Sequence, residues 1–569
     1  MTDMTKAELK LVHAGIVDRP AGRFKIESGA GLFASSRICV GTVPKKFTSS
    51  RHEPDLPNVR APPTRAERLL PPAMSLLDWI IVVAYLAVVF GIGLYHSRRQ
   101  KTTEDFFLAG KNVPGWVVVF AIVGTMISST SFIGHPGNVF ARDMWNLPSF
   151  LLLPVVMVFV ARTIVVFYRR TIRMSIYDYL ERRFNYGARA YGAAAFIVSR
   201  VVDMSATLYF LAVPVSYLTG FDVKWVILIV GAVTLAMTVA GGLAAVVYSD
   251  VLQGVLLIVG ALVCVGIALF RPEQGPMAVL HTAWEGGKFG LGTWEFSWHR
   301  ENIWFFLVGG AIWAVQRYAL DQHIVQKYLV ARTDRQAQLS AFLGAIACLP
   351  IWLMFFLFGA FLWAFFQLTG VPLPAEVAAV KDNIVPYFLK TQLPTGLIGL
   401  VVAALLAAAM SSLDSDLNSM ATVIVDDFFG RLRPQATDQQ KLWLGRVAVT
   451  TLGVLSIGFS LLWIGIGTAL ELGVQLFSIA TAGMLGLFAL GALTQRAHGR
   501  GALVGIATCV VFTGWATFTS VKLPALDRTL VDLGAFNYQL HPFLIGIFNH
   551  VILMVVGYVA SLVIPAKRA

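Results

Sequence analysis

The sequence predicts an all-α polytopic membrane protein, and three observations carry that prediction. Hydrophobic residues make up 57% of the 569 residues and charged residues only 14%, whereas a water-soluble domain carries about 25% charged residues. The mean hydropathy is +0.70. The apolar residues are gathered in runs of about 20, long enough to cross a hydrocarbon core about 30 Å thick.

The first 73 residues differ from the rest of the chain. They are polar, contain prolines and have no apolar run of signal-peptide length. Met74 begins Met-Ser-Leu-Leu-Asp-Trp directly before the first apolar run and would make a natural start. We interpret 1–73 as a disordered or untranslated N-terminal extension, with a regulatory tail as the alternative, and 74–569 as the transmembrane domain.

Thirteen membrane spans follow in the remaining sequence. They are predicted near 76–95, 115–140, 148–168, 188–220, 224–240, 243–270, 303–320, 338–368, 393–424, 442–466, 470–494, 502–521 and 541–563. The longer connections and the stretch 321–338 are expected to lie outside the bilayer, the latter as an amphipathic cytoplasmic segment.

Basic residues are distributed unevenly between the alternate loops. One set of loops, which includes Lys327, carries 20 Lys and Arg, and the other set carries nine. Cytoplasmic loops are enriched in Lys and Arg, so we expect the amino terminus outside and the carboxyl terminus in the cytoplasm, in the inner membrane of a cell. The formal charge of +13 forms no basic stripe, and nucleic acid is not an expected partner.

The span 115–140 is predicted to be a broken helix. Gly124, Gly134 and Gly137 weaken it, and Pro136 cannot donate a backbone hydrogen bond. Five hydroxyl residues fall among them: Thr125, Ser128, Ser129, Thr130 and Ser131. The alternative is an intact helix packed through small residues, with the hydroxyls bonded to their own backbone.

The span 393–424 carries carboxylates in its polar half. Ser411, Asp414, Ser415 and Asn418 share one helical face by their spacing. A carboxylate in mid-membrane requires a cation, a proton or a partner, so we predict a cation site at Ser411, Ser412 and Asp414. Its oxygen ligands suit a hard cation. Asp416 lies on the opposite face, and we place it at the cytoplasmic interface.

Three further charged residues allow two interpretations each. Asp250, early in span 243–270, holds a second cation or caps the helix start. Arg200 and Asp203 are three residues apart. They either neutralise each other inside the bundle, which we favour slightly, or Arg200 binds a substrate carboxylate.

The second half of the chain offers a counterpart to the first broken helix. Gly309 and Gly310 are predicted to interrupt span 303–320. If 115–140 opens one five-helix unit and 303–320 opens the next, the odd number of spans per unit makes the second unit inverted. Transporters build their sites from such inverted repeats with discontinuous helices.

At these residues the chain resembles the sodium/solute symporter family, and among its members the bacterial sialic-acid symporters. The resemblance covers 74–566 and rests on five ordered segments: 98–116, 175–184, 248–254 (Tyr-Ser-Asp-Val-Leu-Gln-Gly), 325–330 (Val-Gln-Lys-Tyr-Leu-Val) and 411–419 (Ser-Ser-Leu-Asp-Ser-Asp-Leu-Asn-Ser). It implies a LeuT-type fold with two inverted five-helix repeats, and sodium-coupled symport by alternating access.

The resemblance also implies site residues. The principal sodium ion would be held by the carbonyls of Gly124, Ile127 and Ala408 and the hydroxyls of Ser411 and Ser412. An additional sodium site would comprise Asp250, Ser411, Asp414 and Ser415, although the sialic-acid symporters have a serine at the position of Asp414.

The same resemblance places the solute at Ser128, Ser131 and Arg200. Met126 and Leu151 replace polar residues of the sialic-acid symporters, so we expect a small hydroxylated or anionic solute, namely a sugar acid, a sialic acid-like compound or a sugar. The protein is expected to be a monomeric transporter in the lipid bilayer and not an enzyme. The alternatives are a proton-coupled transporter, based on Asp250 and Asp414, and a membrane sensor on a transporter scaffold.

Overall fold

The structure is a computed structural model that describes residues 74–97, 102–172, 174–464, 476, 479–520, 522–523, 528–529 and 531–565. All of these residues belong to one compact unit, Pro63–Ala569. The predicted N-terminal extension, 1–73, lies outside the described residues, so its nature stays a prediction.

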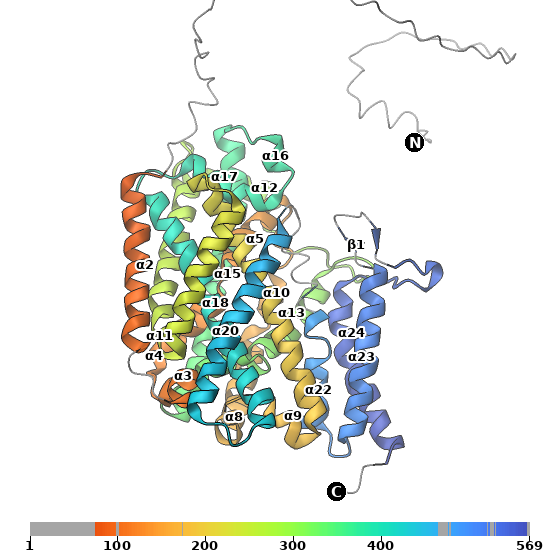
Figure 1. Cartoon of the computed structure of the whole chain (residues 1–569). Coiled ribbons are helices and arrows are strands. Elements are labelled where there is room, and N and C mark those ends of the chain that lie inside the picture. The colour runs from red at the N-terminus through yellow and green to blue at the C-terminus, as the bar shows by residue number, and fades with distance from the viewer. Residues whose placement is uncertain are drawn as a thin grey trace, which may run out of the picture. The chain divides into compact units, whose positions relative to one another are not determined.

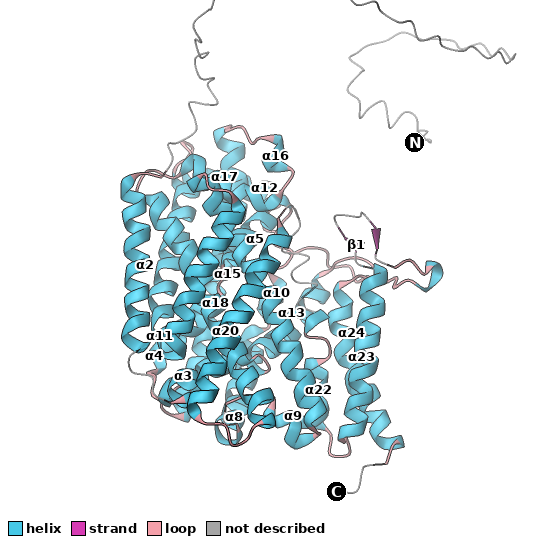
Figure 2. Ribbon diagram, in the orientation of Figure 1, coloured by secondary structure: helices cyan, strands magenta, loops and turns pink. Residues whose placement is uncertain are grey.

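Helices make up nearly all of the described fold (Figure 2). Nine helical segments are long and apolar enough to cross a bilayer, and two sharply bent helix pairs raise the number to 11 within the described residues. The nine segments are α2 (Leu76–Ser97); α6 (Pro148–Leu151), α7 (Leu153–Phe159), η3 (Val160–Ile164) and α8 (Val165–Thr171) in series; α10 (Tyr186–Thr219); the second part of α11 (Val223–Phe270); α15 (Asp334–Thr369); α18 (Leu397–Val423) with η5 (Ile424–Phe429) and α19 (Gly430–Leu432); α20 (Asp438–Ser460) with η6 (Leu461–Trp463); α23 (Gly499–Ser520); and α24 (Phe543–Val563).

Two of the thirteen predicted spans correspond to shorter apolar helices, Val223–Val239 and Met484–Leu493 (α22). The first is the opening part of α11, which is interrupted at Gly242 by backbone angles of φ 54° and ψ −173°. Only glycine adopts such a conformation readily, so the two predicted spans of this region meet at this residue. The second helix, Met484–Leu493, follows residues 465–483, of which the structure describes only some. Among the residues that the structure describes, nine to 11 spans are therefore supported, and the number thirteen stays a prediction.

The two bent pairs are α4 (Gly115–Met126) with α5 (Ser129–Ala141), bent by 53°, and α13 (Ile303–Ala319) with α14 (Gln322–Leu329), bent by 50°. In the first pair Ile127 and Ser128 have extended backbone conformations. In the second pair Asp321 does. The predicted discontinuity is therefore confirmed for span 115–140. The predicted interruption within span 303–320 is wrong, because α13 is continuous there and the second bend falls just beyond it, before α14.

The residues predicted to cause the breaks lie within continuous helix instead: Gly134, Pro136 and Gly137 in α5, and Gly309 and Gly310 in α13. These glycines permit close packing. A Cβ atom on Gly137 would lie 2.6 Å from the carbonyl oxygen of Lys381, and one on Gly310 would lie 2.0 Å from that of Ser149. Small residues let backbones approach each other closely inside a membrane bundle.

Helix α18 is the central element of the bundle. Of its most apolar stretch, 89% is buried, against 22% for α2 at the outside. It packs against α2, α4, α10, α11 and α20, as the arrangement in Figure 1 also shows. Polar side chains on α18 therefore have no access to water or lipid except through a cavity.

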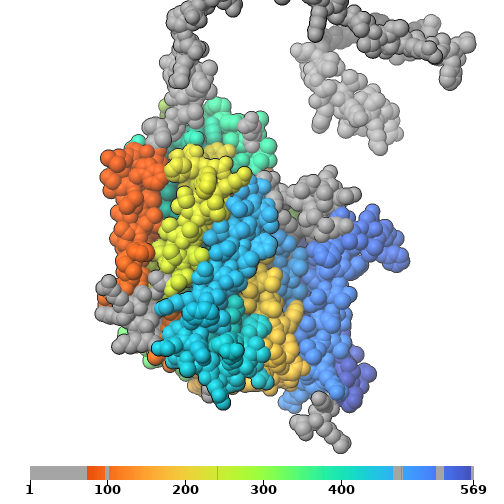
Figure 3. All heavy atoms as spheres, in the orientation of Figure 1, coloured from red at the N-terminus to blue at the C-terminus, as the bar shows by residue number. Residues whose placement is uncertain are grey.

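Shorter elements lie at the two ends of the spans, and α20 lies on the outside (Figures 1 and 3). Its outward side chains include exposed Trp443, Val454 and Phe459, as expected for a surface that faces lipid. The remaining elements are α3 (Thr103–Leu108), η2 (Ala109–Lys111), α9 (Asp178–Arg183), α12 (Gly275–Glu285), α16 (Ala375–Ala378), η4 (Lys381–Asn383), α17 (Ile384–Gln392), η7 (Gly534–Phe536) and the antiparallel pair β1 (Lys522–Leu523) and β2 (Arg528–Thr529).

Candidate ion and solute site

The end of α4 and the middle of α18 meet inside the bundle. Ser412 Oγ donates hydrogen bonds to the carbonyl oxygens of Thr125, 3.2 Å away, and Ala408, 3.3 Å away. Thr125 Oγ1 and Ser415 Oγ are hydrogen-bonded at 3.0 Å. The structure thus brings oxygen atoms of Thr125 on α4 and of Ala408, Ser412 and Ser415 on α18 to one buried place.

Gly124 shows how close this approach is. A Cβ atom at this position would lie 2.8 Å from Ser411 Oγ and 3.2 Å from the carbonyl oxygen of Asp250. The glycine is therefore required by the meeting of α4, α11 and α18. It does not itself mark the bend, which begins three residues later at Ile127.

The bend provides acceptors that a continuous helix would not. The last four carbonyl groups of a helix lack partners within it, and α4 ends at Met126 with extended Ile127 and Ser128 beyond. Together with the hydroxyls of α18, these carbonyls form a set of uncharged oxygen atoms. Such a set suits a hard monovalent or divalent cation and offers no nitrogen or sulfur ligand.

Asp250 lies beside this place and is paired with a lysine. Its Oδ1 accepts a hydrogen bond from Ser411 Oγ, and its Oδ2 lies 2.6 Å from Lys327 Nζ. Both charged side chains are fully buried. Asp250 lies eight residues beyond the Gly242 interruption within continuous helix, so the interpretation of Asp250 as a helix cap is wrong.

Lys327 is the residue of this site that the sequence did not reveal. It was counted with the cytoplasmic loops, but it lies on α14, whose residues are all buried. The segment after residue 320 is amphipathic at its start, as expected, but α14 is buried in the bundle rather than lying at its surface. The nearby Arg332 and Arg335 gave the stretch the composition of a loop.

Asp414 and Ser415, the other predicted ligands of the second ion site, lie on the same side of α18 as Ser411. Asp414 accepts a hydrogen bond from Thr238 Oγ1 in the first part of α11, and Ser415 contacts Thr125. Ser411, Asp414 and Ser415 thus lie on the side of α18 that faces α4 and α11, and Asp250 of α11 meets them there. With Lys327, this group carries two carboxylates and one ammonium group.

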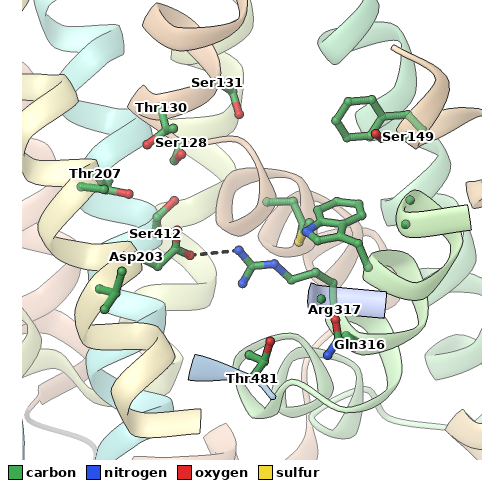
Figure 4. A pocket seen from close by; sticks show the side chains of 18 of the residues that line it. Ser128, Thr130, Ser131, Ser149, Asp203, Thr207, Gln316, Arg317, Ser412 and Thr481 are labelled. Atoms are coloured by element: carbon green, nitrogen blue, oxygen red, sulfur yellow. Dashed lines mark hydrogen bonds and ion pairs between the residues drawn. The ribbon is translucent and has the colours of Figure 1, made fainter. Parts of the chain in front are cut away.

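A cavity of about 230 Å³ lies on the other side of Ser412 (Figure 4). Polar side chains of the first bend line it, together with aromatic side chains of α6, α10, α13 and α15. Its hydroxyl and amide groups come from Thr125, Ser128, Thr130, Ser131, Asn146, Ser149, Thr207, Gln316, Ser412 and Thr481. Aromatic walls with a few convergent polar groups are typical of a small-molecule site.

A cluster of charged side chains, buried except for Asp203 and Arg317, forms one wall of this cavity. Arg200 lies 2.9 Å from Asp203, 3.5 Å from Asp321 and 3.5 Å from Asp416. Arg317 lies 3.0 Å from Asp203 and 3.1 Å from Asp321. His323 Nδ1 lies 2.6 Å from Asp321 Oδ1. The pairing of Arg200 with Asp203 was predicted, but the cluster around it is much larger.

Two predictions about this wall are wrong. Asp416 does not lie at the cytoplasmic interface; it is buried, lines the cavity and pairs with Arg200. Leu151, expected in a solute-contacting position, is 52% exposed and outside the cavity lining. Asn146, Ser149 and Phe150 line the cavity in its place, so the predicted register of this segment was displaced.

Two bent spans that meet at a polar cavity within a membrane-spanning bundle define a secondary transporter. The profile of the sodium:solute symporter family matches residues 106–508. The chain belongs to this family. It is therefore a multi-pass membrane transporter that couples the movement of a small solute to that of sodium, and it is not an enzyme.

Relatives with known activities agree with this assignment. The sodium/sialic acid symporter NanT of Aliivibrio fischeri is 28% identical over 494 residues, which cover 85% of this chain and 93% of NanT. The human sodium-coupled monocarboxylate transporter 1 is 27% identical over 80% of this chain and 75% of its own length. A solved structure of a Na⁺-coupled sialic acid symporter, substrate-bound and outward-open, is 26% identical with a TM-score of 0.77, covering 87% and 99% of the two chains. The last similarity confirms the LeuT-type fold.

Proposed function

We propose that one sodium ion binds where the end of α4 meets α18. Its ligands are the carbonyl oxygens of Gly124, Ile127 and Ala408 and the hydroxyls of Ser411 and Ser412. The observation that carries this proposal is the hydrogen bonding of Ser412 to Thr125 and Ala408, since it brings oxygen atoms of both helices together at the broken end of one of them.

The same position explains how sodium is coupled to the solute. Ser412 is both a proposed ligand of the ion and part of the cavity lining, and Thr125 and Met126, which lie between the proposed ligands Gly124 and Ile127, also line the cavity. Helices α4 and α18 come from different repeats, so an ion bound between them stabilises the conformation in which they meet. That conformation also places Ser128 and Ser131 at the cavity. Coupling of this kind amounts to about 1–3 kcal/mol.

The solute is proposed to be a small hydroxylated compound, namely a sugar acid, a sialic acid-like compound or a sugar. The cavity has many hydroxyl groups and two guanidinium groups, and relatives carry sialic acid and monocarboxylates by name. Ser128, Ser131 and Arg200 are the contacts proposed for it. Asp250, Ser411, Asp414 and Ser415 are proposed to hold a second sodium ion.

The transporter is proposed to act as a monomer in the inner membrane. The amino terminus lies outside and the carboxyl terminus lies in the cytoplasm. The excess of Lys and Arg in one set of loops supports this orientation, and the removal of buried Lys327 from that set leaves the excess intact.

Replacement of the α18 hydroxyls tests the ion site. Ser411→Ala and Ser412→Ala are each expected to abolish sodium-dependent uptake while the protein still inserts. Ser460→Ala is the matched control, because Ser460 is also buried and its Oγ donates to the carbonyl oxygen of Ser456 in its own helix. Radiolabelled uptake into proteoliposomes, in sodium and in choline, measures the effect over a panel of sugar acids and sugars. Unchanged sodium-dependent uptake in both variants refutes the ligand assignment.

A further inference from the structure

The two arginines that line the cavity differ in their surroundings. The side chain of Arg200 is 1% exposed and enclosed by Asp203, Asp321 and Asp416. The side chain of Arg317 is 12% exposed, and it extends from α13 across the cavity to Asp203 on α10 (Figure 4). Of the two guanidinium groups, that of Arg317 is the more accessible to a solute.

Asp203 also differs from the other two carboxylates of the cluster. Its side chain is 34% exposed, whereas those of Asp321 and Asp416 are 8% and 5% exposed. One oxygen atom, Oδ2, accepts hydrogen bonds from both Arg200, at 2.9 Å, and Arg317, at 3.0 Å. Asp203 is therefore the carboxylate that can turn from Arg317 toward the cavity without burying an unpaired charge.

We infer that Arg317, rather than Arg200, selects for a carboxylate on the solute. In the structure Asp203 accepts a hydrogen bond from Arg317, and the carboxylate of the solute takes the place of Asp203 there. The inference rests on the proposed function, because it requires the cavity to be the solute site. Arg200, proposed above as a solute contact, also holds Asp203 next to Arg317 through its hydrogen bond to Asp203 Oδ2.

The number of charges in the cluster explains why the carboxylate of the solute must replace Asp203 on Arg317 rather than bind beside it. Asp203, Asp321 and Asp416 already face two guanidinium groups, so a further anion added beside them would meet repulsion. An anion that replaces Asp203 on Arg317 leaves the number of carboxylates on that guanidinium unchanged. A neutral hydroxyl is a weaker acceptor than a carboxylate, so it does not displace Asp203. The preferred class is thus a small polyhydroxylated carboxylate.

Substitution of Arg317 tests the inference through the difference between charged and neutral solutes. The probes are radiolabelled N-acetylneuraminate, glucuronate and gluconate, each paired with a neutral counterpart: the methyl ester of N-acetylneuraminate, glucose and sorbitol. In Arg317→Gln the KM for a transported carboxylate is expected to rise about 10- to 100-fold, or about 1.4–2.8 kcal/mol, the range of a hydrogen bond to a charged group. The KM for neutral solutes is expected to stay unchanged, and Arg317→Lys is expected to recover part of the loss.

Three further variants complete the experiment. Asp203→Asn is expected to lower the KM for carboxylates, because it removes their competitor. The double variant Asp203→Asn/Arg317→Gln removes one charge of each sign, so it keeps the cluster balanced if Arg317→Gln alone fails to fold, and it is expected to lose the carboxylate preference. Arg142→Gln is the matched control, since Arg142 pairs with Glu301 at an exposed site outside the cavity.

The outcomes separate the inference from the proposed function. Transport that proceeds equally in choline and sodium contradicts the proposed function. Sodium-dependent transport in which Arg317→Gln, or the double variant, retains the wild-type preference for carboxylates overturns the inference alone. Failure of every carboxylate in the panel to be transported by the wild type also overturns it.

Discussion

The bend between α4 and α5 and the bend between α13 and α14 have similar angles, 53° and 50°, but different groups line them. At the first bend the groups are backbone carbonyls and the hydroxyls of serine and threonine. At the second bend they are the charged side chains of Arg317, Asp321 and Lys327, with His323.

This difference teaches how one backbone feature serves two purposes. Uncharged oxygen atoms can bind a bare cation and release it again, because they need no counter-charge when the ion leaves. Fixed charges in a medium of low dielectric constant each require a partner, and Arg317 and Lys327 have theirs on α10 and α11, respectively. The first bend is thus suited to the ion, and the second to the solute and to holding the bundle together.

The largest effect is expected from removal of the lysine at the second bend. Lys327→Met leaves Asp250 buried without its counter-charge, and breaking a buried ion pair costs about 3–5 kcal/mol. The thermal unfolding temperature of the detergent-purified protein should therefore fall sharply, and its yield with it. The double variant Lys327→Met/Asp250→Asn removes both charges and should recover most of the loss. Equal instability of the single and double variants would mean that the pair is not what stabilises this bend.

An intermediate effect is expected at the first bend from Gly124→Ala. The added Cβ atom would lie 2.8 Å from Ser411 Oγ and 3.2 Å from the carbonyl oxygen of Asp250, so the Ser411 hydroxyl must turn away or α4 must shift, and either change displaces oxygen atoms of the ion site. Overpacking of this kind costs about 1–3 kcal/mol, and the sodium concentration for half-maximal uptake should rise about 10- to 100-fold. Gly91→Ala on α2 is the control, since a Cβ atom there meets nothing within 4 Å. Should both alanine variants show the wild-type dependence on sodium, the ion does not bind at Gly124.

The two bends also differ in how far the sequence predicted them. At the first bend the hydroxyl residues lie next to each other in the chain, and their density together with glycine and proline indicated a broken helix. The bend itself falls at Ile127 and Ser128, and not at any of the glycines or the proline of the span. Its position is set by packing between α4 and α18, which the sequence alone does not reveal.

The charges of the second bend were not predictable because their partners are distant in sequence. Lys327 and Asp250 are 77 residues apart, Arg317 and Asp203 are 114 apart, and Arg200 and Asp416 are 216 apart. Each charge taken by itself is typical of a loop or a membrane interface. Asp416 was correctly placed on the face of α18 opposite Asp414, but that face borders a cavity rather than water at the membrane surface.

The smallest effect is expected for a single hydroxyl on the cavity side of the first bend, in Ser131→Ala. Loss of one hydrogen bond between neutral groups costs about 0.5–1.5 kcal/mol, so the KM for the solute should rise about 2- to 10-fold. The sodium dependence of uptake should hardly change, because Ser131 lies beyond the bend on α5.

Ser129→Ala is the matched control. Ser129 is two residues away, but its Oγ donates to the carbonyl oxygen of Thr207 at 2.7 Å, and it does not line the cavity. Ser129→Ala should lower the unfolding temperature of the protein slightly and leave the KM for the solute unchanged. An unchanged KM in Ser131→Ala together with a raised KM in Ser129→Ala would mean that the solute meets α5 on its other face, and that the division of the first bend into an ion side and a solute side is wrong.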